Sequence, residues 1–176
     1  MFRRIAARVR DEWRLKRDPV AFARSLGVTI GEGCRLLGTT RGTFGSEPWL
    51  VTLGRHVTVT DGVKFVTHDG AVWVFREGHP DVDRFGPIVV GDNVFLGIGC
   101  VLLPDVRIGS NTVVAAGAVV TKDQPGGAIV GGTPARVLGT IEDYWKRHEH
   151  EFLHVRSLPP DEKRRRVLAH LAERKR

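Results

Sequence analysis

Residues 88–130 read IVVGDNVFLGIGCVLLPDVRIGSNTVVAAGAVVTKDQPGGAIV. Aliphatic residues recur here at a fixed interval of six, at Val90, Leu96, Leu102, Ile108, Val114 and Val120. Smaller residues form a second series, four positions after each aliphatic one: Val94, Cys100, Val106, Thr112 and Ala118. Neither the helical period of about 3.6 nor the strand period of 2 alone produces this spacing. It predicts a chain wound in short parallel strands around a narrow core, with Gly or Ala at corners where a larger side chain would be strained.

The spacing of six is interrupted at the sequence THDG, residues 67–70. It is present upstream at Leu53, Val59 and Phe65, but residues 70–87 have no such period and are rich in aromatic side chains. A loop of this length inside a compact repeat domain is usually functional, and insertions in repeat proteins tend to collect on the binding face. The sequence therefore directs the search for a site to this interruption.

The two ends of the chain have helical spacing. We expect an amphipathic helix over 2–17, whose apolar positions include Trp13, and a short helix over 19–26 that is capped by Asp18. Helical spacing returns over 141–152, and a last helix opens at Pro159. Helices in these places are expected to cap the ends of the coil.

Composition is typical of one globular domain. The chain has 176 residues, of which 41% are hydrophobic and 21 are glycine. No apolar run approaches the roughly 20 residues of a membrane span, and the start lacks the core of a secretory signal, so we expect no transmembrane segment and a cytoplasmic protein. Cys34 and Cys100 both fall in the series of small residues and are expected to be reduced and packed.

Positive charge is concentrated at the two ends. Residues 1–17 hold seven Arg or Lys against two acids, and residues 159–176 hold seven against three. Basic ends suit either an anionic partner or solvated helix faces. Without a nucleic-acid motif or interleaved aromatic residues, the solvated faces are favoured and no nucleic-acid partner is expected.

The repeat resembles that of the left-handed β-helix acyltransferases. The sequences GAVVTKD at 117–123 and GGTPARV at 131–137 are similar to the end of the maltose and galactoside O-acetyltransferase branch. The resemblance implies a mainly β fold, a left-handed parallel β-helix with helical extensions. Its parts are an N-terminal helical region over 1–26, the β-helix over 27–138 with the inserted loop 70–87, and a C-terminal helical extension over 139–176.

His68 is the candidate catalytic residue, because it lies where the winding ends and the loop begins. A neutral imidazole can take a proton from a hydroxyl that attacks a thioester and return it to the departing thiolate. The resemblance implies the same role, since the family's catalytic histidine opens such a loop and FVTHDG matches it in position. The competing interpretation is a structural histidine in a turn.

The acceptor side has four candidates. The resemblance implies that a polar residue about one turn before the histidine holds the acceptor, and Glu47 is the loose match; a turn-forming acid is the alternative. Asp69 and His79 either contact substrate or hold the loop. Trp73 either supports a sugar ring or packs the loop onto a neighbour.

The donor side is expected to bind acetyl-CoA, without a metal. The segment Ala116-Gly117 offers an unobstructed backbone, Thr121-Lys122 a hydroxyl and an ammonium, and Arg136 a rigid fork for phosphate. The resemblance implies acetyl-CoA contacts at these positions and at Ile98. Two positions depart from the family pattern. Ile98 stands where the galactoside enzymes have a small polar residue, and Gly139 stands where a second basic residue is sometimes found.

The resemblance further implies a homotrimer with its clefts between subunits and a small saccharide as the acceptor. The favoured function is O-acetylation of a saccharide or glycoconjugate. The alternatives are N-acetylation of an amino sugar, a zinc carbonic anhydrase-like enzyme, and a non-catalytic scaffold. The zinc enzyme needs three convergent histidines, two of them about five residues apart, whereas His68 and His79 lie eleven apart.

Overall fold

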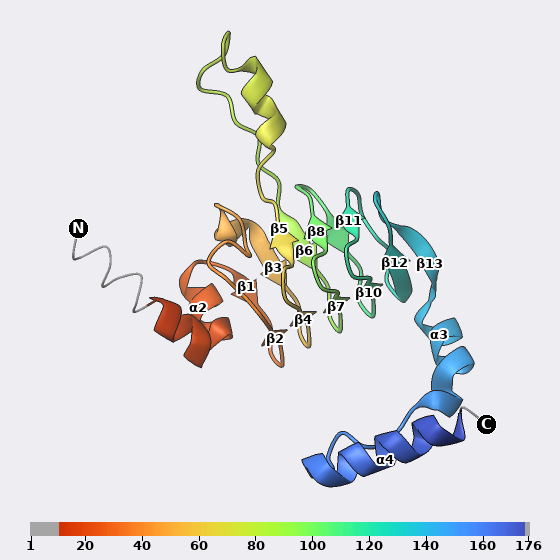
Figure 1. Cartoon of the computed structure of the whole chain (residues 1–176). Coiled ribbons are helices and arrows are strands. Elements are labelled where there is room, and N and C mark those ends of the chain that lie inside the picture. Colours follow the sequence, from red (N-terminus) through yellow and green to blue (C-terminus); the bar gives the residue numbers. More distant parts are fainter. Residues whose placement is uncertain (1–10, 175–176) are drawn as a thin grey trace. The chain divides into compact units, whose positions relative to one another are not determined.

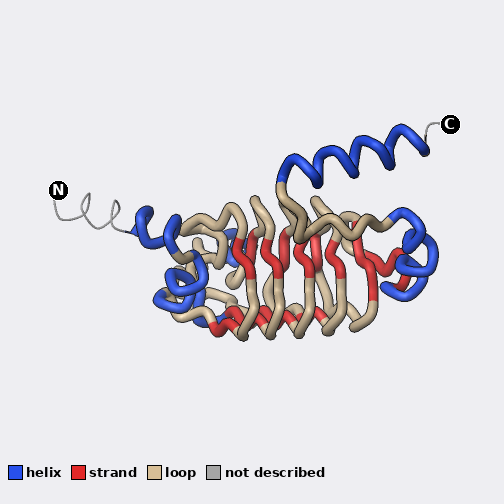
Figure 2. The backbone as a smooth tube through the Cα atoms, turned by 90° about the horizontal axis from the view of Figure 1, so that it is seen from below, coloured by secondary structure: helices blue, strands red, loops and turns tan. Residues whose placement is uncertain are grey.

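The computed structural model describes residues 11–174. It contains two compact units, one that ends at Ile141 and one that begins at Glu142. Short strands form the framework of the first unit, where Figures 1 and 2 show them stacked turn upon turn. Helices make up the second unit.

Three sheets form the first unit, and each collects strands from successive turns. The first sheet contains β1 (Thr29–Ile30), β3 (Val51–Leu53), β6 (Ile88–Val90) and β9 (Arg107–Ile108). The second contains β2 (Arg35–Leu36), β4 (Thr58–Val59), β7 (Phe95–Leu96), β10 (Val113–Val114), β12 (Ala128–Gly131) and β13 (Arg136–Thr140). The third contains β5 (Lys64–Phe65), β8 (Val101–Leu102) and β11 (Val119–Val120). From β3 to β11 the chain visits the three sheets in the same order, with a corner after each.

The strand register explains the spacing of six. Val90 pairs with Ile108, and Leu96 pairs with Val114, so one turn takes 18 residues, or three repeats. Every aliphatic residue of the series is at most 1% exposed, and every residue of the small series is at most 2% exposed. The predicted coil and its core are confirmed. Burial of each large side chain stabilises the fold by about 1.5–3 kcal/mol.

Glycine at the corners has a different cause from the predicted strain. Gly97 and Gly109 have no left-handed φ angle. A Cβ on Gly97 would lie 2.5 Å from the backbone nitrogen of Ala116. A Cβ on Gly109 would overlap the backbone nitrogen of Gly126. Clearance between successive turns therefore excludes a side chain at these two positions.

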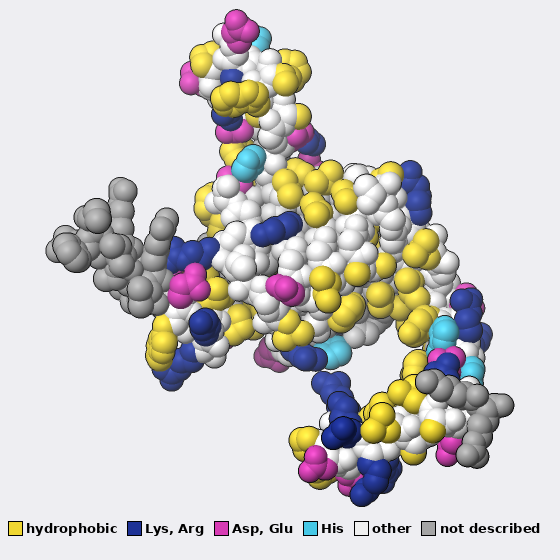
Figure 3. Space-filling model, in the orientation of Figure 1, with side chains coloured by type: hydrophobic (Ala, Val, Ile, Leu, Met, Phe, Trp, Pro, Cys, Tyr) yellow, Lys and Arg dark blue, Asp and Glu magenta, His cyan; other side chains and the backbone are white. Residues whose placement is uncertain are grey.

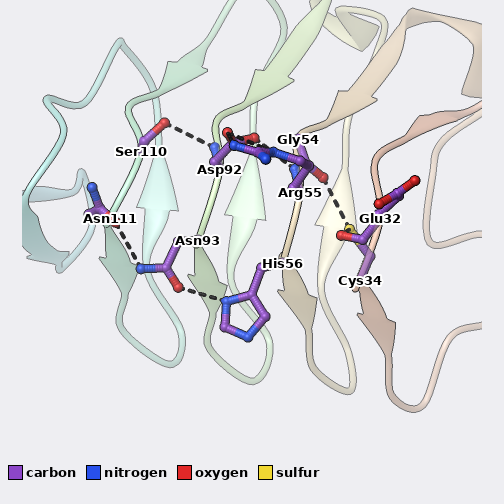
Figure 4. A network of polar contacts seen from close by, with 9 residues as sticks. All are labelled: Glu32, Cys34, Gly54, Arg55, His56, Asp92, Asn93, Ser110 and Asn111. Carbon is purple, nitrogen blue, oxygen red and sulfur yellow. Dashed lines mark hydrogen bonds and ion pairs between the residues drawn. The ribbon is translucent and has the colours of Figure 1, made fainter.

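The corner after the first sheet carries a ladder of polar side chains (Figure 4). His56, Asn93 and Asn111 occupy successive turns with φ of 54–56°. The His56 Nδ1 and the Asn93 Nδ2 each lie 2.8 Å from the amide oxygen of the next residue in the ladder. Beside them, the backbone N–H and the guanidinium of Arg55 hold the pKa of the Asp92 carboxyl below its usual value. These contacts tie the turns together at the surface.

The N-terminal helices match the prediction in part. Residues 2–10 of the first expected helix lie outside the described residues, and 11–17 are helical. Trp13, an apolar position of that helix, is 59% exposed there. The second helix, α2 (Pro19–Ser25), is capped by Asp18, whose Oδ1 accepts from the backbone of Ala21 at 2.8 Å. Its Ala23 joins the coil's core, and its Val20 packs against that core.

The other end of the coil is closed by a strand. After β12 the chain reverses, and β13 pairs antiparallel with β12 up to Thr140. The second unit then contains α3 (Ile141–His148), the 3-10 helix η3 (Glu149–Glu151) and α4 (Pro160–Glu173), where helices are predicted. Within residues 11–174, no helix is both long and apolar enough to cross a membrane.

The core position of Cys100 leads to a reactivity prediction. Its side chain is fully buried, and this burial raises the pKa of its thiol to about 12. Iodoacetamide at pH 8 should leave Cys100 unmodified in the folded protein, because the thiolate is the reactive form. Peptide mass spectrometry should detect its modification only after guanidinium unfolding. Equal labelling rates in the folded and unfolded protein would contradict the buried placement.

Candidate active site

His68 lies at the corner after the third sheet, three residues beyond the end of β5. Residues 69–86, here called the arm, leave the coil at this point and return to β6 (Figure 1). Leu53 pairs with Val90 across the arm at a separation of 37 positions, so the turn that contains the arm is 19 residues longer than the ordinary turn of 18. The His68 side chain is 40% exposed. The break in the repeat therefore puts an accessible imidazole at the edge of the coil.

The two sides of the arm hold the backbone around His68. His68 forms an antiparallel bridge with Phe85, and their rings meet edge to face at 6.3 Å. On either side, Gly86 N–H donates to the Thr67 carbonyl at 3.0 Å and Asp69 N–H donates to the Arg84 carbonyl at 2.8 Å. These bonds fix the direction in which the imidazole leaves the coil.

Glu47 comes from the same corner one turn earlier. The turn before Glu47 is aligned with β5, since Phe65 N–H donates to the Thr43 carbonyl at 2.8 Å and the Phe44 and Phe65 rings stack at 5.1 Å. This alignment brings Glu47 beside His68, whereas the sequence suggests either an acceptor contact or a turn-forming acid for it. Its side chain is 14% exposed.

The Glu47 carboxylate joins two neighbours. Its Oε2 accepts from the Thr67 hydroxyl at 2.6 Å and lies 3.1 Å from His68 Nδ1. An ionised carboxylate only accepts hydrogen bonds, so Nδ1 is the donor in this contact. Gly45 makes room for this arrangement, because a Cβ there would lie 2.6 Å from the Thr67 hydroxyl. The contact thus leaves Nε2 as the ring nitrogen that can accept a proton when the imidazole is neutral.

The other acceptor candidates lie on the arm. Asp69 caps the 3-10 helix η2 (Gly70–Phe75): its Oδ1 accepts from Ala71 N–H at 3.0 Å, and its Oδ2 accepts from Arg84 at 3.1 Å. Both carboxylate oxygens of Asp69 therefore have partners within the arm. His79 is exposed, and its backbone N–H donates to the Phe75 carbonyl at 2.9 Å.

Trp73 is 72% exposed and lines a hollow on the arm. Hydrophobic side chains gather over the arm's surface in Figure 3, and they include Val74, Phe75 and Phe85. Trp73 therefore does not pack the arm onto its own coil, and its indole is available to a ligand or to another chain.

The donor candidates frame the far end of the third sheet. Ile98 and Ala116 are exposed on one edge, one turn apart, where Gly117 N–H donates to the Ile98 carbonyl at 2.8 Å. Thr121 and Lys122 are exposed on the other edge, at the corner that holds His68 two turns earlier. Arg136 begins β13, and the preceding residue, Ala135, bonds to the third sheet. These residues share one region, and His68 lies on an earlier turn.

The contacts that sequence reasoning missed join different turns. The Glu47–His68 pair is one, and the bridge from Arg84 to Asp69 and Asp105 is another. The stacked phenylalanines carried a usable signal, because Glu47 precedes His68 by 21 positions, as Phe44 precedes Phe65. For the zinc alternative, residues 11–174 contain no group of three or more His, Cys, Asp or Glu that could hold a metal ion.

Comparisons with known proteins agree on one protein family for this chain. Residues 87–122 match the family model described as Bacterial transferase hexapeptide (six repeats). Protein CapG of Staphylococcus aureus is 49% identical over 121 residues, which cover 69% of this chain and 70% of that protein. A 2,3,4,5-tetrahydropyridine-2,6-dicarboxylate N-acetyltransferase of Staphylococcus aureus (strain JH9) is 50% identical over 52 residues, 30% of this chain and 22% of that enzyme.

A crystal structure adds the fold. The hexapeptide-repeat acetyltransferase from Vibrio cholerae has a TM-score of 0.55 and 26% identity, and the match covers 68% of this chain and 77% of that one. The predicted family is thereby confirmed, and the non-catalytic alternative is set aside. The chain belongs to the bacterial hexapeptide-repeat transferases and is an acyltransferase of that family.

Proposed function

We propose that the protein transfers an acetyl group from acetyl-CoA to a hydroxyl of a saccharide or glycoconjugate, with His68 as the general base. The observation that carries this proposal is the pair of His68 and Glu47, 3.1 Å apart at the accessible edge of the coil. A carboxylate on Nδ1 fixes the ring and its tautomer, as a base at Nε2 requires.

The proposed reaction is one direct transfer. The acceptor hydroxyl gives its proton to His68 Nε2 while its oxygen attacks the thioester carbonyl. The carbon–sulfur bond then breaks, and the imidazolium returns the proton to the CoA thiolate. The Glu47 carboxylate stabilises the transient imidazolium. This stabilisation is larger where the imidazolium charge is partly shielded from water. The products are the acetyl ester and free CoA thiol.

The proposed donor site is the end of the third sheet. A pantetheine arm needs backbone groups along a groove, and Ala116 and Gly117 leave the backbone uncovered. Thr121 and Lys122 supply a hydroxyl and an ammonium. Arg136 supplies the guanidinium for phosphate, since only backbone carbonyls accept from it in the described contacts. Ile98 contributes a backbone contact only.

We further propose a homotrimer with left-handed winding, in which His68 of one chain faces the donor residues of the next. Two features support it: His68 and the donor residues lie on different turns, and the arm exposes Trp73, Val74 and Phe75. Apolar side chains this exposed are typical of an interface. A stable, fully active monomer in sedimentation experiments would contradict the shared site.

Replacement of Arg136 by alanine should raise the KM for acetyl-CoA roughly tenfold and leave kcat nearly unchanged, because a phosphate contact binds the ground state and transition state alike. Arg35→Ala is the matched control, since β2 and β13 are opposite edges of the same sheet. Steady-state kinetics with varied donor measures both values. A fall in kcat at constant KM would argue against phosphate binding by Arg136.

N-acetylation of an amino sugar is the second candidate. One observation favours transfer to nitrogen: the Staphylococcus aureus relative that is 50% identical over 52 residues is named an N-acetyltransferase, although its named acceptor is a dicarboxylate and not a sugar. Thiol release from acetyl-CoA should be followed with a panel of sugars, nucleotide sugars and amino sugars. O-acetylation predicts turnover with acceptors that have no amine. Turnover confined to amines would select the second candidate.

A further inference from the structure

The return side of the arm is attached to the next turn of the coil by Arg84. Its Nη2 lies 2.8 Å from Asp105 Oδ2, and its Nη1 lies 3.1 Å from Asp69 Oδ2. Asp105 follows β8 at the corner after the third sheet, one turn beyond the His68 corner. A single guanidinium therefore links the outgoing side of the arm, its return side and the coil.

Backbone packing supports the same attachment. A Cβ on Gly86 would lie 2.5 Å from the Asp105 backbone nitrogen, so the arm's return side rests directly on Asp105. Asp105 has a φ of 64°, which turns the chain at this point. By comparison, the Arg76–Asp83 ion pair, at 3.1 Å, lies within the arm and does not tie it to the coil.

Arg84 is directly connected to the bonds that hold His68. Its own carbonyl accepts from Asp69 N–H, and the next two residues supply the Phe85 bridge and the Gly86 bond that flank the histidine. A shift of the return side would move all three contacts together. An error of about 1 Å in the position of a catalytic group can cost up to a hundredfold in rate.

We propose that Arg84 is a positioning residue, whose bridge from Asp69 to Asp105 fixes the arm so that His68 keeps its catalytic orientation. The proposal rests on the proposed function, in which His68 is the base. It also gives Asp69 a role in orienting the arm. Because all three side chains are at least 36% exposed, the ion pairs add little global stability. Their effect should therefore appear in local order and in kcat.

The test compares Arg84→Gln with Arg55→Gln in the full-length protein. Arg55 also pairs with an aspartate of the next turn, at a distance of 3.1 Å from Asp92, but at the corner after the first sheet. Arg84→Gln should speed hydrogen exchange of the Asp69 and Gly86 amides and lower kcat roughly tenfold, with the donor KM and the melting temperature unchanged. Arg55→Gln should change neither the exchange of these amides nor kcat.

Two further variants refine the test. Asp105→Asn keeps a residue that tolerates positive φ and should lower kcat in the same direction. Arg84→Lys, which offers one ammonium in place of a two-sided fork, should give an intermediate kcat. Unchanged hydrogen exchange in Arg84→Gln would show that the bridge from Asp69 to Asp105 does not hold the arm. Faster exchange with unchanged kcat would overturn the positioning role of Arg84. Exchange does not depend on acetyl transfer, whereas full activity of His68→Ala would overturn the proposed function itself.

Discussion

Replacement of His68 by alanine should lower acetyl transfer by more than about a hundredfold, the usual loss when a general base is removed. Without the imidazole, the group proposed to take the proton from the attacking hydroxyl is missing. Because the side chain is 40% exposed, the change leaves no large cavity, and the fold should be retained. The measurement is kcat for thiol release from acetyl-CoA, with circular dichroism and the melting temperature as checks of folding.

His56 is the matched control for this variant. It belongs to the same coil and also has a polar partner on Nδ1, but it lies at the corner after the first sheet. His56→Ala should therefore keep the wild-type kcat. A His68→Ala protein that is folded and retains more than a tenth of the wild-type kcat would rule out the imidazole as the principal base.

Replacement of Glu47 by glutamine should lower kcat by between tenfold and a hundredfold, as the loss of a group that orients a catalytic histidine typically does. The amide has no negative charge to stabilise the imidazolium, and its NH₂ group can pair with Nδ1 and favour the wrong tautomer. The measurement is steady-state kinetics with donor and acceptor varied separately. Glu32→Gln, an exposed acid near the first turn, is the control.

The same experiment distinguishes the two roles of Glu47. If it positions His68, as its 3.1 Å separation from Nδ1 indicates, kcat falls and the acceptor KM stays nearly constant. If it holds the acceptor, as the resemblance implies, the acceptor KM rises and kcat is nearly preserved. A variant with wild-type values of both would exclude either role.

The coil was predictable because its repeat is local in sequence. A turn of 18 residues places every sixth side chain on the axis, so the spacing of Val90, Leu96 and Leu102 directly identifies the core residues. The strand β13 has no such pattern in the sequence. Its five residues are mostly exposed and follow neither period, and its antiparallel pairing with β12 depends on the reversal before it.

The site was predictable only in part. His68 was singled out because the spacing breaks there, which the sequence shows directly, and its catalytic role stays a prediction. The partnership with Glu47 was not predictable, since the contact joins two turns and the segment before Glu47 alters the ordinary separation of 18 to 21. The bridge from Arg84 to Asp69 and Asp105 was not predictable either, because it depends on where the arm rejoins the coil. The donor residues Ile98, Ala116, Thr121, Lys122 and Arg136 stay predictions.

The most direct test of the proposed chemistry is to identify the product formed from acetyl-CoA and a saccharide acceptor. We expect wild-type protein to release one thiol for each acceptor that gains the mass of one acetyl group, and we expect that group to be removed by mild alkali, as an ester is. The His68→Ala protein should form almost none of this product. An alkali-stable amide, or equal ester formation by wild-type and His68→Ala proteins, would contradict the account.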